Sequence, residues 1–427
     1  MYSEVIVPKF VIEQSEPLRG EVEISGSKNA VLPIMAATLL TDDVCEINDV
    51  PHLTDVLVMC DILRSMGAKV NEDWKTHSLI IDNSGLNTSE APSEFVKKMR
   101  ASFFIMGPLL ARTGRASIAL PGGCSIGNRP IDLHNKGLRQ LGAVIRIEQG
   151  KVDAMIEQPK GALVYLDFPS VGATENIMMA ATLATGVTTI ENAAEEPEIV
   201  DLANFLNKMG AKIKGAGTDT IKIEGVSKLH GTRHAVIPDR IETGTFMIAA
   251  AITRGDILIK NAVPDHVRPM IAKLMECGVI VNDEVDGLRV RGDIRNLVAT
   301  DIKTLPYPGF PTDMQSLFMS FLTTVEGTST VIETVFENRF MHAAELSRMG
   351  ANIEVNGRKA TIPGNVYQLK GARVASTDLR GGAALVLAGL VAEGKTEVTD
   401  IYHIERGYED FAYKLQSLGA KITREDD

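Results

Sequence analysis

Six copies of one short pattern run along this chain at nearly constant spacing. They are LRSMGAKV (63–70), LRQLGAVI (138–145), LNKMGAKI (206–213), LMECGVIV (274–281), LSRMGANI (346–353) and LQSLGAKI (415–422). Each ends a predicted helix with a glycine, which is typical of a cap residue in the left-handed region, where a side chain would clash. The β-branched residues after the glycine begin a strand. A single repeated unit therefore fills the 427 residues.

An apolar stretch precedes each pattern. The six stretches are 30–40, 102–111, 176–184, 245–252, 316–325 and 383–392. A helix that is apolar on every face is buried on every face. At 8–11 residues these segments are too short to span a membrane.

Between the apolar stretch and the glycine, the sequence predicts a strand and a surface helix. Strands are expected at 188–193 and 256–262, and 198–209 has apolar residues at helical spacing. The predicted unit is buried helix, strand, surface helix, glycine, strand.

Six units divide into two α/β domains of three repeats each. The segment 233–240, which contains a proline, lies between the third and fourth units. The strand region 4–25 has no partner in its own unit, so we expect it to complete the second domain. The predicted domains are 22–236 for the first, and 1–21 together with 237–427 for the second.

Charge and composition exclude several classes of protein. A net charge of −11 argues against a nucleic-acid partner, which requires a basic surface. The first ten residues lack the basic head and apolar run of a signal peptide. Four cysteines without paired spacing indicate neither a disulfide framework nor a zinc site. We expect a cytoplasmic protein with no membrane or nucleic-acid partner.

Five arginines occupy equivalent places in the repeats, either near the start of a buried helix or in the loop after the strand that follows one. Because helix N-termini bind anions, this placement predicts a small, multiply charged anionic ligand. The alternative is five solvated surface arginines. The residues are Arg100, Arg129, Arg339, Arg380 and Arg406.

The segment LPGGCSIGNRP (120–130) has the glycine-rich composition of an active-site lid. Cys124 at its centre is expected to be exposed, with Arg129 favouring its thiolate. The other three cysteines, Cys45, Cys60 and Cys277, fall in predicted helices or strands and are expected to be structural.

A family resemblance rests on several motifs in order. They are GSKNAVLP (26–33), KKMRAS (97–102), LPGGCSIGNRPIDLH (120–134), VGAT (171–174), PTDMQ (311–315), ETVFENRFMH (333–342), TDLR (377–380) and IERGYE (404–409). From about residue 4 to residue 422 the chain resembles the UDP-N-acetylglucosamine 1-carboxyvinyltransferase family. The family fold has two inside-out α/β domains with the active site in the interdomain cleft.

The resemblance implies an activity. Members transfer the enolpyruvyl group of phosphoenolpyruvate to the 3-hydroxyl of UDP-N-acetylglucosamine and release phosphate, in the first committed step of peptidoglycan synthesis. They use no cofactor or metal and are alkylated by fosfomycin. The alternative activity is that of 3-phosphoshikimate 1-carboxyvinyltransferase, whose relatives lack the cysteine loop. A binding scaffold is a third reading, but 5% aromatic residues disfavour it.

The family's roles carry over by position. Lys28 and Asn29 match the pair that binds phosphoenolpyruvate. The cluster that holds the phosphate of phosphoenolpyruvate is matched by Lys28, Arg129 and Arg406. The group near its carboxylate is matched by Arg339 and Arg380. The expected nucleotide-sugar and further substrate contacts are Arg100, Arg129, Pro130, Ile131, Asp132, Leu133, Ser170, Val171, Gly172, Asp313, Val335 and Asp378. Some relatives carry a lysine in the stretch just before Ser170. This chain has Asp167, Phe168 and Pro169 there, so no phosphate contact is expected from that stretch.

The chemistry requires a base near the sugar hydroxyl and an acid near C3 of the enolpyruvyl group. Asp313 is the candidate base, and the alternative is an ordinary helix N-cap. Cys124 is the candidate acid, and a thiol can also attack C2 to hold a covalent adduct. Lys28 and Arg406 complete the predicted catalytic set.

Overall fold

The structure is a computed structural model that describes residues 8–120, 131–293, 296–364 and 368–426. The chain divides into two compact units, each considered by itself below. One contains 26–120 and 131–237, and the other contains 8–25 and 238–426. The chain thus passes between units at 25/26 and 237/238, compared with 21/22 and 236/237 expected from sequence.

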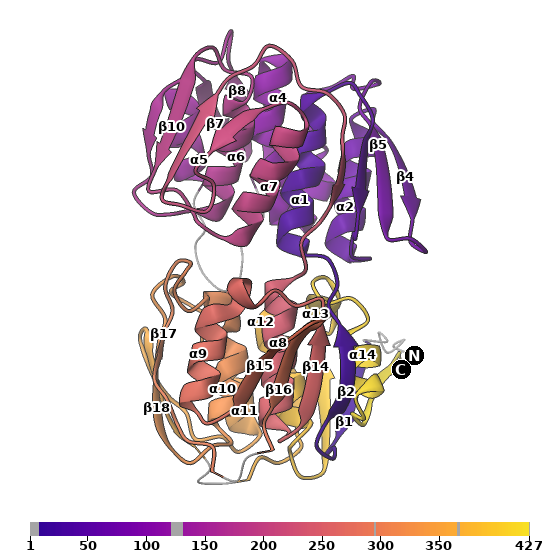
Figure 1. Cartoon of the computed structure of the whole chain (residues 1–427), viewed down its shortest axis with the longest axis vertical. Helices are drawn as coiled ribbons and strands as arrows, with labels where there is room; N and C mark the ends of the chain where they lie inside the picture. The colour runs from indigo at the N-terminus through magenta and orange to yellow at the C-terminus, as the bar shows by residue number, and fades with distance from the viewer. Residues whose placement is uncertain (1–7, 121–130, 294–295, 365–367, 427) are drawn as a thin grey trace. The chain divides into compact units, whose positions relative to one another are not determined.

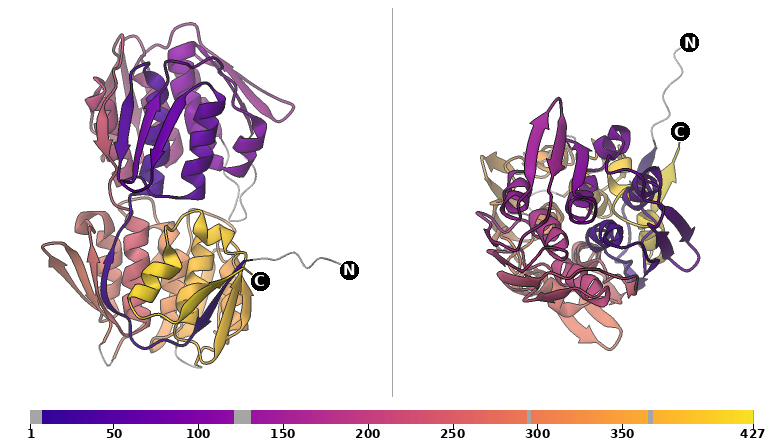
Figure 2. Two further views of the ribbon diagram at one scale, coloured as in Figure 1. Left: turned by 90° about the vertical axis from the view of Figure 1, so that its right-hand side faces the viewer. Right: turned by 90° about the horizontal axis from the view of Figure 1, so that it is seen from above.

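Apolar helices form the centre of each unit (Figure 1). In α8 every residue from Ile241 to Ile252 is buried, which explains why its sequence is apolar on every side from Phe246 to Ile252. Sheets and amphipathic helices surround these central helices, as Figure 2 shows from two further directions. The central helices are α1 (Lys28–Ala37), α4 (Met106–Thr113), α6 (Val171–Ala181), α8 (Arg240–Ile252), α10 (Gln315–Leu322) and α12 (Leu379–Gly389).

The repeated glycines end the surface helices as predicted. All six have positive φ, from 91° at Gly278 to 104° at Gly142. The residue after each glycine donates its N–H to the carbonyl of the leucine that begins the repeated pattern, as Ala68 does to Leu63 at 3.0 Å. This hydrogen bond satisfies a carbonyl that the helix leaves open. These helices are α2 (Thr54–Ser65), α5 (Asp132–Gln140), α7 (Pro197–Lys208), α9 (Arg268–Glu276), α11 (Met341–Arg348) and α14 (Phe411–Ser417).

Short helical segments connect the larger elements. They are α3 (Ser93–Lys98), α13 (Tyr402–Glu405), and the 3₁₀ helices η1 (Thr38–Leu40), η2 (Arg100–Ile105), η3 (Pro264–Val267) and η4 (Thr312–Met314).

Each unit contains three sheets, and each sheet is larger than the sequence predicted. In five sheets a second hairpin strand follows the one after the glycine, and in five sheets a parallel strand is added at one edge. Unit 26–237 has the sheets β13 (Arg233–Ala235)–β3 (Cys45–Asn48)–β5 (Ser78–Asp82)–β4 (Lys69–Asp73), β11 (Lys212–Lys214)–β12 (Thr220–Glu224)–β10 (Val187–Glu191)–β9 (Leu163–Tyr165) and β6 (Arg115–Ala119)–β8 (Lys151–Met155)–β7 (Val144–Glu148).

The unit containing the two ends of the described chain follows the same plan. Its sheets are β21 (Arg373–Ala375)–β22 (Lys395–Thr399)–β1 (Lys9–Glu13)–β23 (Ile422–Glu425), β15 (Ile280–Glu284)–β16 (Gly287–Arg291)–β14 (Asp256–Lys260)–β2 (Arg19–Glu23) and β17 (Ile302–Lys303)–β18 (Gly327–Ile332)–β20 (Lys359–Gly364)–β19 (Glu354–Asn356).

The N-terminal strands complete two of these sheets. β1 lies between β22 and β23 and is antiparallel to both, while β2 pairs in parallel with β14. Figure 2 shows the indigo β1 beside the yellow C-terminal strands. The last repeat thus obtains its second hairpin strand from the other end of the chain.

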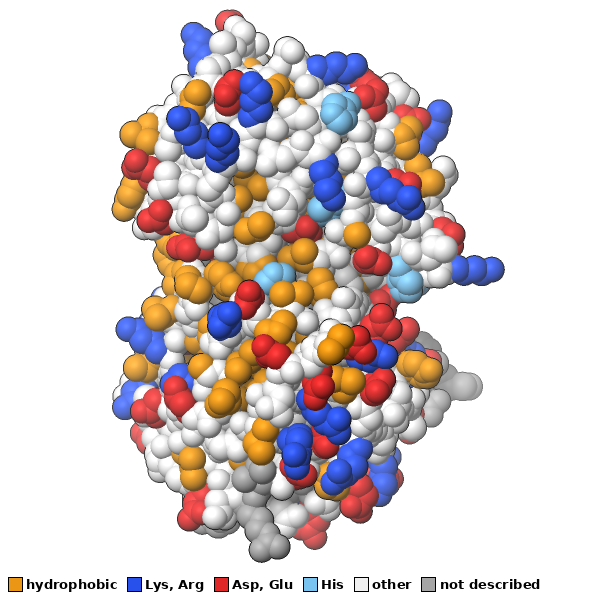
Figure 3. All heavy atoms as spheres, in the orientation of Figure 1, with side chains coloured by type: hydrophobic (Ala, Val, Ile, Leu, Met, Phe, Trp, Pro, Cys, Tyr) orange, Lys and Arg blue, Asp and Glu red, His pale blue; other side chains and the backbone are white. Residues whose placement is uncertain are grey.

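The fold is therefore α/β, with two domains of three repeated helix–strand units each. Among the described residues, no helix is both long and apolar enough to cross a bilayer. On the face drawn in Figure 3, lysines and arginines lie among aspartates and glutamates.

Candidate functional site

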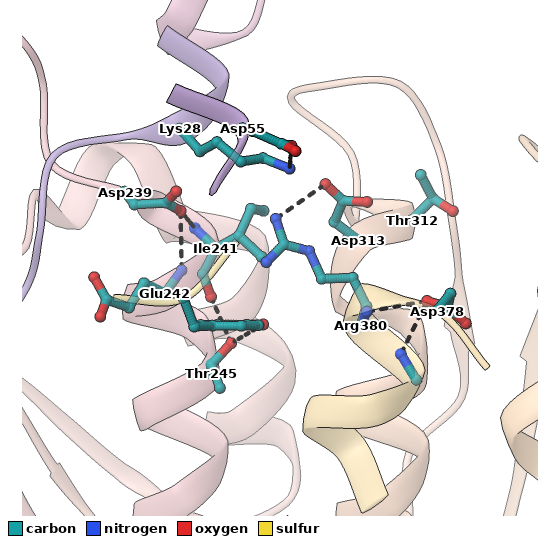
Figure 4. A network of polar contacts seen from close by, with 12 residues as sticks. Lys28, Asp55, Asp239, Ile241, Glu242, Thr245, Thr312, Asp313, Asp378 and Arg380 are labelled. Atoms are coloured by element: carbon teal, nitrogen blue, oxygen red, sulfur yellow. Dashed lines mark hydrogen bonds and ion pairs between the residues drawn. The ribbon is translucent and has the colours of Figure 1, made fainter. Parts of the chain in front are cut away.

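Two buried arginines converge on one aspartate in the unit that contains 238–426. Asp313 lies in η4, and its Oδ1 accepts a hydrogen bond of 2.6 Å from Arg339 Nη2. Arg380 Nη2 lies 3.7 Å from Oδ2, as drawn in Figure 4. Both arginine side chains are 4% exposed, whereas the Asp313 side chain is 28% exposed. The pair holds Asp313 while leaving its carboxylate partly open.

Asp313 is not a helix cap. The N-cap residues of η4 and α10 are Pro311 and Met314, and neither helix receives a side-chain capping bond. Asp313 is therefore not the N-cap residue of either helix, and its carboxylate binds the guanidinium of Arg339.

Both arginines beside Asp313 keep an N–H donor without a partner in the described ranges of the chain. Burial acts to lower the pKa of Arg380, but the neighbouring Tyr408 and Asp313 outweigh it and raise that pKa. The Arg380 guanidinium lies 5.1 Å from the Tyr408 ring, whose hydroxyl is 2.9 Å from Thr245 Oγ1. Within the described residues, Arg339 Nε and Arg380 Nη1 have no hydrogen-bond partner. Two permanent cations with unpaired, buried N–H donors favour an anionic ligand.

The start of α12 fixes the backbone beside Arg380. Asp378 is its N-cap, and its Oδ1 accepts the N–H groups of Arg380 and Gly381 at 3.0 Å each. Figure 4 shows Asp378 at the base of the Arg380 side chain. This carboxylate thus has a structural role in addition to the substrate contact predicted for it.

The segment with Val335 is held by an acid that sequence reasoning did not single out. Glu333 is fully buried at the end of β18, and its Oε1 accepts the N–H of Val335 at 2.8 Å. The other oxygen, Oε2, accepts from Thr312 Oγ1 at 2.9 Å. Thr312 in turn accepts from Arg339 Nη1 at 3.1 Å. Glu333 is therefore connected to the Asp313 cluster.

In the unit 26–237, Lys28 opens the buried helix α1. Its Nζ lies 3.3 Å from Oδ2 of Asp55, in the first turn of α2. The two side chains are 12% and 6% exposed. Asn29, the next residue of α1, is half-buried. Asp55 was not among the predicted site residues, because it lies 27 residues from Lys28 in the sequence.

The predicted sugar contacts of the same unit lie at two helix starts. Ile131, Asp132 and Leu133 begin α5, and Ser170 caps α6 by accepting the Ala173 N–H at 3.4 Å.

Gly172 lies in the first turn of α6, where space is limited. A Cβ added there would lie 3.2 Å from His134 Cε1, so the glycine allows α5 and α6 to approach closely. In the preceding segment, the side chain of Asp167 pairs with Lys136 at 2.6 Å.

Several predicted site residues are not tested by the geometry. Cys124, Arg129 and Pro130 lie outside the described residues, and for Arg100 only the backbone, at the start of η2, is described. Arg406 is the C-cap of α13 and is partly buried.

The remaining cysteines are buried and free, as expected. Burial is the main cause that raises the pKa of both Cys60 and Cys277 to about 12, so neither is a reactive thiolate at neutral pH. Cys45 is also buried, and burial raises its pKa. No group of three or more potential metal ligands is arranged to hold an ion within the described ranges.

Comparison with known proteins identifies the family. Residues 12–415 match the family described as EPSP synthase (3-phosphoshikimate 1-carboxyvinyltransferase). The chain is 62% identical over 416 residues to UDP-N-acetylglucosamine 1-carboxyvinyltransferase 1 of Caldanaerobacter subterraneus subsp. tengcongensis, covering 97% of this chain and 99% of that protein. It is 59% identical to UDP-N-acetylglucosamine 1-carboxyvinyltransferase 2 of Carboxydothermus hydrogenoformans, covering 98% and 100%.

Solved structures share the fold. The enolpyruvyl transferase NikO from Streptomyces tendae superposes with a TM-score of 0.88 at 25% identity, covering 98% of this chain and 99% of that one. An EPSP synthase from Acinetobacter baumannii has a TM-score of 0.75 at 20% identity, with 98% and 100% covered, and supports the fold alone. With near-complete coverage at 59–62% identity, the chain belongs to the UDP-N-acetylglucosamine 1-carboxyvinyltransferase family, a branch of the enolpyruvyl transferases.

Proposed function

We propose that this protein transfers the enolpyruvyl group of phosphoenolpyruvate to the 3-hydroxyl of UDP-N-acetylglucosamine and releases phosphate. The observation that carries the proposal is the identity of 56–62% to four curated relatives that bear this activity in their names. The 3-phosphoshikimate activity belongs to more distant members of the same family. We further propose that the enzyme acts in the cytoplasm, at the first committed step of peptidoglycan synthesis.

The reaction proceeds by addition and elimination. The sugar hydroxyl loses its proton to a base and attacks C2 of the enolpyruvyl group, while C3 gains a proton from an acid. The tetrahedral adduct then loses phosphate by cleavage of the C–O bond, and C3 returns its proton. Asp313 is the proposed base and Cys124 the proposed acid, which is consistent with the chemistry of a carboxylate and of a thiol that is mostly protonated at neutral pH.

The described geometry supports the assignment of Asp313. A base must be held in one position while one oxygen remains accessible. Arg339 Nη2 donates a hydrogen bond of 2.6 Å to Asp313 Oδ1, and the Asp313 side chain is 28% exposed.

The cationic groups match the charges of phosphoenolpyruvate. The unpaired N–H donors of Arg339 and Arg380 are proposed to neutralise its carboxylate. Lys28, Arg129 and Arg406 are proposed to neutralise its phosphate.

A phosphate-release assay tests the function. Phosphoenolpyruvate with UDP-N-acetylglucosamine should release phosphate, whereas phosphoenolpyruvate with shikimate 3-phosphate should not. Release with shikimate 3-phosphate alone would replace the proposal by the alternative activity.

Fosfomycin tests the role of Cys124. A soft thiolate opens the epoxide, so mass spectrometry should locate one adduct on the peptide containing Cys124. The buried thiols of Cys60 and Cys277 provide internal controls and should remain unmodified.

Substitution separates the two roles of Cys124. Cys124→Asp keeps an acid but lacks the soft nucleophile, so it should retain turnover, with a lower pH optimum, and resist fosfomycin. Cys124→Ser should lose most activity. Wild-type turnover by the serine variant would exclude Cys124 as the proton donor.

A further inference from the structure

Glu333 collects four hydrogen-bond donors from three segments. Its Oε1 accepts from Thr304 Oγ1 at 2.9 Å and from the N–H groups of Val335 and Phe336 at 2.8 and 3.1 Å. Its Oε2 accepts from Thr312 Oγ1 at 2.9 Å. The side chain has no exposure to solvent. A buried carboxylate with four donors is costly to disturb and well ordered.

The direction of these bonds extends to Asp313. The Thr312 hydroxyl donates its hydrogen to Glu333 Oε2. Its lone pairs are thereby left for Arg339 Nη1, at 3.1 Å. The other terminal nitrogen, Arg339 Nη2, binds Asp313 Oδ1 at 2.6 Å. One hydroxyl therefore connects the carboxylate of Glu333 to the guanidinium that holds Asp313.

A second contact supports the same arrangement. Glu333 fixes the N–H of Phe336, and the Arg339 guanidinium lies 5.3 Å from the Phe336 ring. Arg339 is thus bounded by two groups that Glu333 positions.

We propose that Glu333 is a positioning residue that orients Arg339 against Asp313 through the hydroxyl of Thr312. This inference rests on the proposed function, in which Asp313 is the base. Glu333 does not touch substrate in this scheme, and its effect reaches the reaction only through Arg339.

Glu333→Gln tests the polarity of the link at nearly constant shape. The two backbone N–H groups at Oε1 require an oxygen there, so the amide nitrogen must occupy the Oε2 position, facing Thr312. Thr312 then faces two donors, the new amide and Arg339, and its own proton loses its carboxylate acceptor. Hydrogen bonds to charged groups are the stronger ones, so we expect kcat to fall about tenfold.

Thr312→Val removes the link from the other side and should give a similar loss. Because Thr312 is only half-buried, this variant remains informative if Glu333→Gln folds poorly. Thr312→Ser keeps the hydroxyl and should restore most of kcat. The matched control is Thr328→Val, at an exposed threonine on β18 of the same unit.

The decisive measurement is the double-mutant cycle. If Glu333 acts through Thr312, the variant carrying both substitutions should have the kcat of Thr312→Val alone, within about twofold, and the KM for UDP-N-acetylglucosamine should change little. Losses that multiply, or wild-type kcat in folded Glu333→Gln, would overturn the positioning role. An inactive wild-type enzyme would instead overturn the proposed function, so the two failures are distinguishable.

Discussion

Glu175 offers a test of the energetics of the core that does not depend on activity. It lies in α6, has no exposure to solvent, and neither carboxyl oxygen has a hydrogen-bond partner in the part of the chain that the structure describes. Burial, followed by the charges of Glu198 and Glu196, raises the pKa of Glu175 well above 4.5. The folded protein therefore holds a proton on Glu175 at pH values where the unfolded chain has released it.

The sign of the pH dependence follows from linkage. A raised folded-state pKa stabilises the fold fully below the unfolded pKa, and this stabilisation is lost as pH rises through the folded pKa. Glu175→Gln keeps the shape and cannot ionise. Relative to wild type, its free energy of unfolding should increase by about 1.4 kcal/mol per pH unit above the unfolded pKa, until the folded pKa is reached.

The assay is urea unfolding of both proteins at half-unit steps from pH 4.5 to 8. Over two pH units the difference in free energy of unfolding between the variant and the wild type should grow by roughly 2.7 kcal/mol, which exceeds the usual error of such measurements. Glu148→Gln, at an exposed position on β7 of the same unit, is the matched control and should change the stability by less than about 0.5 kcal/mol at every pH. A gap that stays constant with pH would refute the reasoning, because it would mean that Glu175 ionises equally in both states.

Three further predictions concern stability and the base. Lys414→Met should lower the free energy of unfolding, measured by heat or urea, by about 3 kcal/mol, because it removes the 2.7 Å ion pair of Glu242. This loss of stability should become smaller as pH falls and Glu242 gains a proton. An unchanged free energy of unfolding would show that the ion pair does not stabilise the fold. Gly419→Ala should lower the free energy of unfolding by about 1–2 kcal/mol, since the φ of 99° is its only source of strain. Gly67→Ala should lower it more, because the added Cβ would lie 2.2 Å from a backbone oxygen. Equal losses of stability in the two variants would contradict this explanation. Asp313→Asn should stay folded and lose about 10²–10⁴ in kcat, and full activity would remove Asp313 from the base role.

The fold was predictable where its signal is local. A positive φ at Gly67 or Gly210 is a requirement of one residue, so the repeat reveals it directly. The second hairpin strands, such as β5 and β12, were missed because they follow the strand after the glycine and lie outside the repeated pattern on which the prediction rested. The parallel edge strands depend on pairing between distant segments, which no local pattern encodes.

The site was predictable as a set of residue types, but its contacts were not. Asp313 resembles a helix cap in its own sequence, and only the return of Arg339, 26 residues later, shows otherwise. Asp55 is likewise 27 residues from Lys28. Glu175 lies within an otherwise apolar helix, where a pattern cannot reveal that a carboxyl group has no partner.

The place of β1 between β22 and β23 has a consequence for the order in which the protein can form. The described residues 26–120 and 131–237 form one unit, and all of them have been synthesised before residue 238, so this unit can fold before the rest of the chain is complete. The other unit must wait, because β1 needs partners at the far end of the sequence; Lys421, for example, donates to Ser15 across 406 residues. Until then the segments of β1 and β2 have no partner strands, because β14, β22 and β23 all follow residue 237.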